Sequence, residues 1–253
     1  MRICRLICVL AVAMLMATPA AAQQPPCPCP PPPAPPPPVW TGSASLGLGL
    51  TSGNSETRNF NVAFDVTRDP KTRHVFKAGL LYLWSSDDGD DTANRLAFQA
   101  REEYKLSDRA YVYGQGQYLR DPFKAIDYLF AATGGLGYKI ADSDTTKFSV
   151  DGGAGVTWEK NPGIDTRTYG AITAGEDFAH KLSPTASITE GVHALWKADD
   201  FGDALYTFGV GLVATVTTKT AVKVDFLDTL KTKPPAEVKK NDLALLVSLA
   251  YKF

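Results

Sequence analysis

Four aspartates surround Gly89 and form the most acidic stretch of the chain: Asp87, Asp88, Asp90 and Asp91. Clustered carboxylates can bind calcium, or the magnesium that bridges lipopolysaccharide molecules. This stretch lacks the ordered ligand spacing of a calcium loop, which favours a solvated extracellular cap over a divalent-cation site. The four aspartates are therefore weak metal candidates, and we expect no cofactor.

The histidines His74, His180 and His193 are the side chains best suited to act as general bases near neutral pH. None has a nearby serine in a recognisable hydrolase motif, and we expect all three to be ordinary strand or turn residues. The glycine-rich segment 134–139 lacks phosphate-loop spacing and continues as a predicted strand rather than a helix. The sequence therefore predicts no enzyme, with no catalytic or cofactor-binding residues.

Charged residues of both signs occupy one face of the predicted strands. The expected lumen-facing set is Asp65, Lys77, Arg101, Glu103, Lys147, Asp151, Lys223 and Asp225, together with Lys252. Burying unpaired charges costs several kcal/mol each, so these groups must pair with one another or meet water. A ladder of pairs would plug a lumen, whereas separated charges would line a narrow aqueous path. The many glycines on the same face favour water.

These charges are positioned by alternating strands. In the last stretch every second residue is apolar: Leu243, Leu245, Val247, Leu249, Tyr251 and Phe253. Similar alternation surrounds Phe60–Val66, Phe148–Trp158 and Phe208–Val216, with weaker examples between them. We count about twelve segments of roughly ten residues, the length that crosses a bilayer at a tilt. The prediction is an all-β, antiparallel, up-and-down transmembrane barrel of the bacterial outer-membrane type.

Connections and tryptophans support this topology. Connections after even segments are compact, and most after odd segments are longer, including 85–92, 120–125 and 198–203. With an even number of strands, this pattern places both barrel ends in the periplasm. Trp84, Trp158 and Trp196 then lie at the outer rim and Trp40 at the inner rim. The alternative is a soluble β-sandwich or lipocalin-like barrel with its apolar face inside.

The N-terminal region differs in composition. Arg2 and Arg5 precede a short apolar run that ends near small residues, which predicts a cleaved signal peptide over residues 1–22. Residues 23–39 form a proline-rich periplasmic arm, which is either a polyproline spacer or a segment that docks on a partner protein. The barrel follows over residues 40–253. Cys27 and Cys29 in the arm could be free thiols, capture a metal or form an intermolecular bridge.

The sequence resembles the YdiY-like family of salt-induced outer-membrane proteins in three stretches: Gly42–Arg58, Tyr111–Tyr138 and Leu249–Phe253. The likeness includes Trp40-Thr41-Gly42 and the Thr51–Thr57 loop, and the proline arm lies outside it. It implies an integral outer-membrane barrel of a Gram-negative bacterium and no established activity. The terminal Tyr251 and Phe253 resemble the signal through which the barrel-assembly machinery recognises such proteins.

The formal net charge of −1 argues against a nucleic-acid partner. Outer-membrane lipid and lipopolysaccharide are the expected surroundings. The leading functional hypothesis is envelope maintenance under salt or osmotic stress with slow, porin-like passage of small solutes. In this hypothesis the stress role comes from the family resemblance alone. The alternative is a selective diffusion channel for small acidic or sugar-like solutes.

Overall fold

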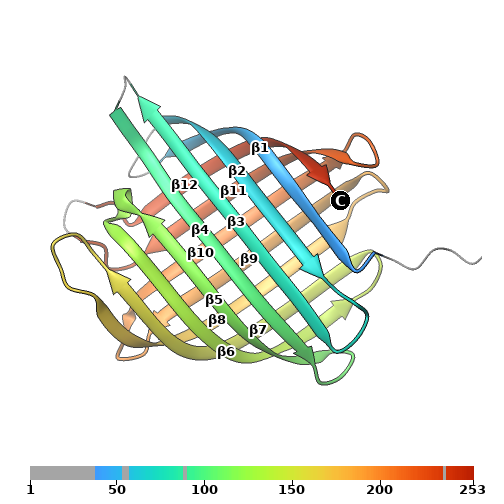
Figure 1. The fold of residues 1–253 in the computed structure, drawn as a ribbon, viewed down its shortest axis with the longest axis horizontal. Coiled ribbons are helices and arrows are strands. Elements are labelled where there is room, and N and C mark those ends of the chain that lie inside the picture. Colours follow the sequence, from blue (N-terminus) through green and yellow to red (C-terminus); the bar gives the residue numbers. More distant parts are fainter. Residues whose placement is uncertain (1–37, 53–56, 88–89, 236–237) are drawn as a thin grey trace, which may run out of the picture. The chain divides into compact units, whose positions relative to one another are not determined.

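The computed structural model describes residues 38–52, 57–87, 90–235 and 238–253. These residues form a closed antiparallel barrel whose strands follow one another in chain order (Figure 1). The strands are β1 Trp40–Ser52, β2 Thr57–Arg68, β3 His74–Asp87, β4 Asp90–Lys105, β5 Ala110–Asp121, β6 Ile126–Asp142, β7 Thr146–Lys160, β8 Arg167–Lys181, β9 Ala186–Lys197, β10 Asp200–Thr215, β11 Thr220–Lys231 and β12 Asn241–Lys252. The predicted fold class is confirmed.

The first and last strands close the barrel. Leu46 lies opposite Leu249, and the backbones of Gly42 and Phe253 exchange hydrogen bonds of 3.0 and 3.1 Å. The Phe253 ring stacks on Phe64 with a centroid distance of 5.9 Å and covers Gly42. A Cβ atom at residue 42 would lie 2.6 Å from that ring, so glycine allows this close approach. Closure leaves no unpaired strand edge in the wall.

The outward face is apolar. Leu46, Leu80, Phe98, Val247 and Leu249 are exposed large side chains at outward positions of their strands, as lipid contact requires. The tryptophans follow the predicted rims: Trp84, Trp158 and Trp196 lie near the ends of β3, β7 and β9, and Trp40 begins β1. Within the described residues, no helix is long and apolar enough to cross a membrane.

The connections define two ends of the barrel. At the turn end lie the short connections 69–73, 106–109, 143–145, 182–185 and 216–219. At the loop end lie 122–125, 161–166, 198–199, 232–235 and 238–240, whereas residues 53–56, 88–89 and 236–237 fall outside the described part. Two predicted loops are shorter than expected, because β3 and β4 continue to Asp87 and from Asp90, and β10 begins at Asp200. The polar ends of β3 and β4 stay paired up to Asp87 and Asp90. Asp200 of β10 pairs with β9, and a register shift follows between Asp200 and Ala204.

Candidate functional site

Two large cavities lie in the lumen formed by the described residues. The central cavity has a volume of about 400 Å³ and is lined by Asp65, Lys223 and Asp225 among others. The turn-end cavity has a volume of about 470 Å³ and is lined by Lys77, Arg101, Glu103 and Lys147. Gln99 and His193 line both cavities, so the two adjoin. The alternation that orients apolar residues outward turns these polar residues inward.

At the turn end, the charges pair along one side of the wall. Arg101 of β4 binds Asp151 of β7 at 2.9 Å and lies 3.1 Å from Glu103. Lys77 of β3 binds Glu103 at 2.7 Å, and the Arg101 guanidinium lies 3.8 Å from the Tyr113 ring centroid. This network contains two cations and two carboxylates. It therefore neutralises its own charge without filling the cavity beside it.

His193 lies within a strand, β9, as the sequence predicts, but its side chain lines the lumen, which the sequence did not indicate. Its Nε2 lies 3.4 Å from Asp177 Oδ1, inside the lumen where the two cavities adjoin. Gly175 and Gly191 make room for the ring, since Cβ atoms there would lie 2.6 and 3.2 Å from it. His74 and His180 lie near the turn end, paired with Glu102 and hydrogen-bonded to Thr146, respectively. The structure therefore does not bring the three histidines together.

The connection between β5 and β6 bends into the loop-end mouth. Asp121 caps a short 3-10 helix, η1 Pro122–Lys124, and Ala125 ends it in a left-handed conformation with φ 53°. Lys124 is only 3% exposed and donates a 2.8 Å hydrogen bond to the Thr229 carbonyl of β11. Because β5 and β11 are six positions apart in a ring of twelve, this contact crosses the lumen.

Further contacts join opposite sides of the same mouth. Arg95 of β4 donates to the Thr229 hydroxyl at 3.0 Å, and Lys124 also pairs with Asp242 of β12 at 3.3 Å. We define these residues together with Asp121 as the mouth bridge. Sequence reasoning missed the bridge, although Asp121 followed by Pro122 is a recognisable signal for a capped helical turn. The bridge narrows the loop-end mouth of the barrel.

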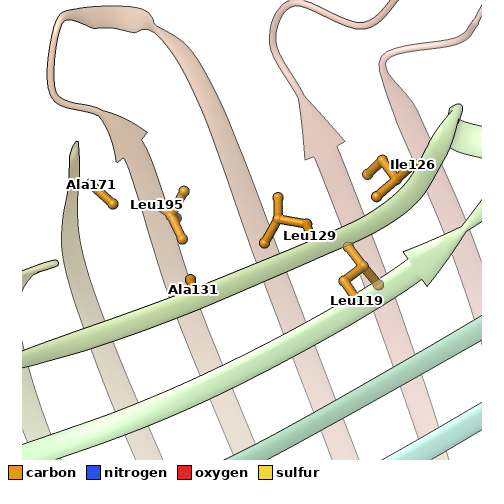
Figure 2. Packing of buried hydrophobic residues seen from close by; sticks show 6 residues of the cluster. All are labelled: Leu119, Ile126, Leu129, Ala131, Ala171 and Leu195. Carbon is orange, nitrogen blue, oxygen red and sulfur yellow. The ribbon is translucent and has the colours of Figure 1, made fainter. Parts of the chain in front are cut away.

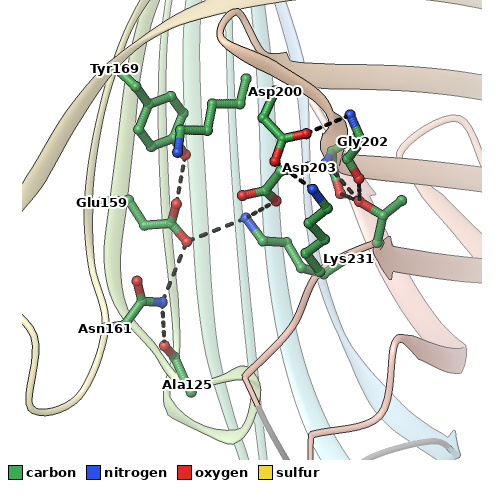
Figure 3. Close-up of polar contacts among 12 residues, drawn as sticks. Ala125, Glu159, Asn161, Tyr169, Asp200, Gly202, Asp203 and Lys231 are labelled. Atoms are coloured by element: carbon green, nitrogen blue, oxygen red, sulfur yellow. Dashed lines mark hydrogen bonds and ion pairs between the residues drawn. The ribbon is translucent and has the colours of Figure 1, made fainter.

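A second polar cluster lies at the loop end and reaches Ala125 at the end of η1 (Figure 3). Glu159 of β7 accepts a 2.6 Å hydrogen bond from the Tyr169 hydroxyl and pairs with Lys231 of β11 at 3.4 Å. Lys231 also lies 3.4 Å from Asp203. Asn161 donates to the Ala125 carbonyl at 2.8 Å, which ties the 161–166 loop to the end of η1. These contacts link two connections and four strands at the loop end.

The central lumen is more apolar than the sequence suggested. Leu119, Ile126, Leu129 and Leu195 form a buried cluster with Ala131 and Ala171, between β5 and β6 in front and the strands behind (Figure 2). The inner face of charged residues and glycines that we expected does not extend to this part of the wall. Apolar runs such as Gly79–Trp84 carried the missing signal, since they place leucines on both faces of one strand.

The weak metal candidates gain no support from the part of the chain that can be described. Asp91 accepts a 3.0 Å hydrogen bond from the Trp84 indole, and Asp88 lies outside the described residues. Within the described ranges, no group of three or more histidine, cysteine, aspartate or glutamate residues could hold a metal ion. The predicted signal peptide, Cys27, Cys29 and the predicted proline arm up to residue 37 also lie outside the described residues.

A closed twelve-stranded barrel with an apolar outer face and a charged lumen is a porin-like barrel of the outer-membrane type. Residues 44–253 match the model of a family described as "Protein of unknown function, DUF481", and the chain belongs to this family. The resemblance seen in the sequence is confirmed: the chain is 23% identical over 168 residues to the uncharacterised protein YdiY of Escherichia coli K12. That match covers 66% of this chain and 65% of YdiY, slightly under two thirds of the relative's length.

The fold resembles that of a solved porin. The NanC porin superposes with a TM-score of 0.57 at 9% identity, over 83% of this chain and 100% of that porin. The translocator domain of the autotransporter NalP from Neisseria meningitidis gives a TM-score of 0.48 at 11% identity, over 85% of this chain and 88% of that domain. At these identities the similarity concerns the fold alone.

Proposed function

We propose that the protein is an outer-membrane barrel of a Gram-negative bacterium that lets small solutes pass slowly. The outward apolar face and the aromatic rims support the membrane location, because such a surface is stable in contact with lipid. The fold shared with the NanC porin is consistent with passage of solutes and with a non-enzymatic role.

The observation that carries this proposal is the pair of adjoining cavities. Together they occupy the lumen from the turn end to the level of Leu119 and Thr229, near the mouth bridge. Charged groups line both cavities, and charged groups in a hollow of this size bind water. The mouth bridge constricts the loop-end entrance, and this supports slow rather than free passage in our proposal.

A structural barrel is the second candidate, and the mouth bridge favours it. Contacts from Arg95 and Lys124 to β11 and β12 brace opposite walls, which would stiffen a barrel that conducts nothing. A role in envelope maintenance under salt or osmotic stress, proposed from the YdiY-like resemblance, suits either candidate. The central carboxylates argue against the small acidic solutes named by our selective-channel hypothesis.

Planar-bilayer recording separates the candidates. The experiment compares the wild-type barrel with a variant in which residues 122–125 are replaced by Gly-Ser-Gly-Ser, and with Asp144→Asn in an exposed turn as control. A channel gives small single-channel steps in the wild type and the control, and severalfold larger steps when η1 is removed. Absence of steps in all three folded proteins would leave the structural barrel.

A further inference from the structure

The central cavity carries an excess of negative charge. Asp65 of β2 and Asp225 of β11 both line the cavity, and their negative charges repel each other. The positive charge of Lys223 attracts both carboxylates. Lys223 Nζ is 3.8 Å from Asp225, a loose ion pair, and no ion pair to Asp65 is formed by the described residues. Two carboxylates therefore share one ammonium group.

The other charges lining this cavity are already matched elsewhere. Arg95 hydrogen-bonds Thr229 and faces Asp121 in the mouth bridge, and His193 pairs with Asp177. Gly79 and Gly211 let the two carboxylates lie close against the wall, because Cβ atoms there would lie 3.2 Å from Asp65 Oδ1 and 2.7 Å from Asp225 Oδ1. Asp65 itself is exposed to the lumen. A cation entering the cavity can therefore reach the two carboxylates.

A second polar group faces the same cavity. Asn61 is only 2% exposed, and its amide nitrogen makes no hydrogen bond. A buried amide without a partner costs free energy that a ligand acceptor would recover. Asn61 and Asp65 are four residues apart on β2, which places their Cα atoms about 13 Å apart.

The wall between these two polar groups is apolar. Ala63 lies between Asn61 and Asp65 on the inward face and is paired with Leu81 of β3. Leu227 and Leu246 line the cavity from β11 and β12. The lining therefore changes from carboxylates to hydrocarbon to an amide donor. A volume of about 400 Å³ suits a small elongated molecule.

We propose that the central cavity binds elongated organic ammonium ions that carry a hydrogen-bond acceptor at the far end, as an ω-amino alcohol does. The ammonium group lies between Asp65 and Asp225, the methylene chain contacts Ala63 and the leucines, and the hydroxyl accepts from Asn61. This inference deepens the proposed function and rests on a lumen that admits solutes.

The test is isothermal titration calorimetry of the refolded barrel in detergent with 6-aminohexan-1-ol. Hexane-1,6-diol and 6-hydroxyhexanoate have similar length without the positive charge, and hexylamine lacks the acceptor. We expect binding of the amino alcohol, at least tenfold weaker binding of hexylamine, and no measurable heat with the diol or the anion. Equal heats for all four compounds would show partition into detergent and overturn the site.

Variants add a signature that a general charge effect cannot give. Asp65→Asn combined with Asp225→Asn should weaken binding at least tenfold, whereas Lys223→Met removes the competing ammonium and should strengthen it severalfold. Asp144→Asn removes one negative charge from an exposed turn away from the cavity and should leave affinity unchanged. If the double variant does not refold, Lys223→Met decides alone: unchanged or weaker binding overturns the proposal.

Two further outcomes are informative. Displacement of the amino alcohol by millimolar magnesium, with heat from magnesium alone that the double aspartate variant abolishes, would identify an inorganic cation site and overturn the proposal. Conductance without binding would retain the channel and remove the site. Binding without conductance would retain the site and remove the channel.

Discussion

The ammonium group of Lys124 donates a 2.8 Å hydrogen bond to the carbonyl of Thr229 on the opposite wall of the barrel. The contact joins a connection at the end of β5 to β11, six positions away in the ring. A strand barrel normally holds itself through neighbouring strands alone. This bond adds a brace across the lumen, and the same brace partly closes the mouth.

Replacing Lys124 with methionine should therefore open and loosen the loop end. Loss of hydrogen bonds that involve a charged group costs about 2 kcal/mol of unfolding free energy. We expect lower stability in urea unfolding and a severalfold larger conductance. Lys139→Met removes an exposed pair with Asp142 at the turn end and should change neither value appreciably. Unchanged conductance in Lys124→Met would show that the bridge does not limit passage.

Arg101 should be the most sensitive residue of the turn-end network. Arg101→Met leaves Glu103 with Lys77 alone and leaves Asp151 without its 2.9 Å partner. Removing one member of a largely buried pair costs about 3–5 kcal/mol. The freed carboxylates should also shift the reversal potential of the channel towards cation selectivity. Arg101→Lys keeps the charge and should retain the selectivity, with part of the stability loss.

Phe253 should control closure of the barrel. Phe253→Ala removes the stack on Phe64 and uncovers Gly42, and we expect slower assembly and less heat-modifiable folded barrel on gels. Phe253→Tyr keeps the ring and should assemble as the wild type does. Gly42→Val places a side chain against the ring and the backbone of Asp65 and should reproduce the alanine defect. Normal assembly of both defective variants would contradict a role for this contact.

The turn at Asp69 predicts a local pH dependence. Partial burial opposes ionisation of this carboxyl, but hydrogen bonds from Lys71 and the charge of Lys105 outweigh it and lower the pKa of Asp69 to about 2. A depressed pKa stabilises the fold above the ordinary value near 3.8, and this contribution is lost as pH falls through about 2. Because Asp69 is largely solvated, the effect stays below about 1 kcal/mol. Carboxyl NMR titration should show the low pKa, and Lys71→Ala should raise it.

The N-terminal region yields a separate expectation. If residues 1–22 are a signal peptide, mass spectrometry of protein from the outer membrane should show a mature chain that begins at Gln23. The proline arm over residues 23–39 should then be reachable by protease only after the outer membrane is permeabilised. Cleavage in intact cells would place the arm outside and reverse the proposed topology.

The sequence predicted the wall better than the lumen. The alternation in Phe60–Val66 and in residues 243–253 marks lipid-facing positions directly, because every second side chain of such a strand contacts lipid. Leu119 and Leu129 were missed because a leucine gives the same signal whether it faces lipid or a neighbouring side chain inside. Contacts such as Arg95 to Thr229 depend on barrel curvature and on strand stagger, which local patterns do not specify.

The pairing of β1 with β12 joins residues that lie far apart in the chain: Leu46 meets Leu249, a separation of 203 positions. All other neighbouring strands are consecutive in the chain and can pair locally. The β1–β12 pairing therefore has the largest entropic cost of loop closure, and we expect it to form last. Until then the molecule is a curved ribbon with two free edges, each able to add a foreign strand. A partner protein that pairs with one free edge would protect the chain from aggregation until closure. It would be released when β1 pairs with β12.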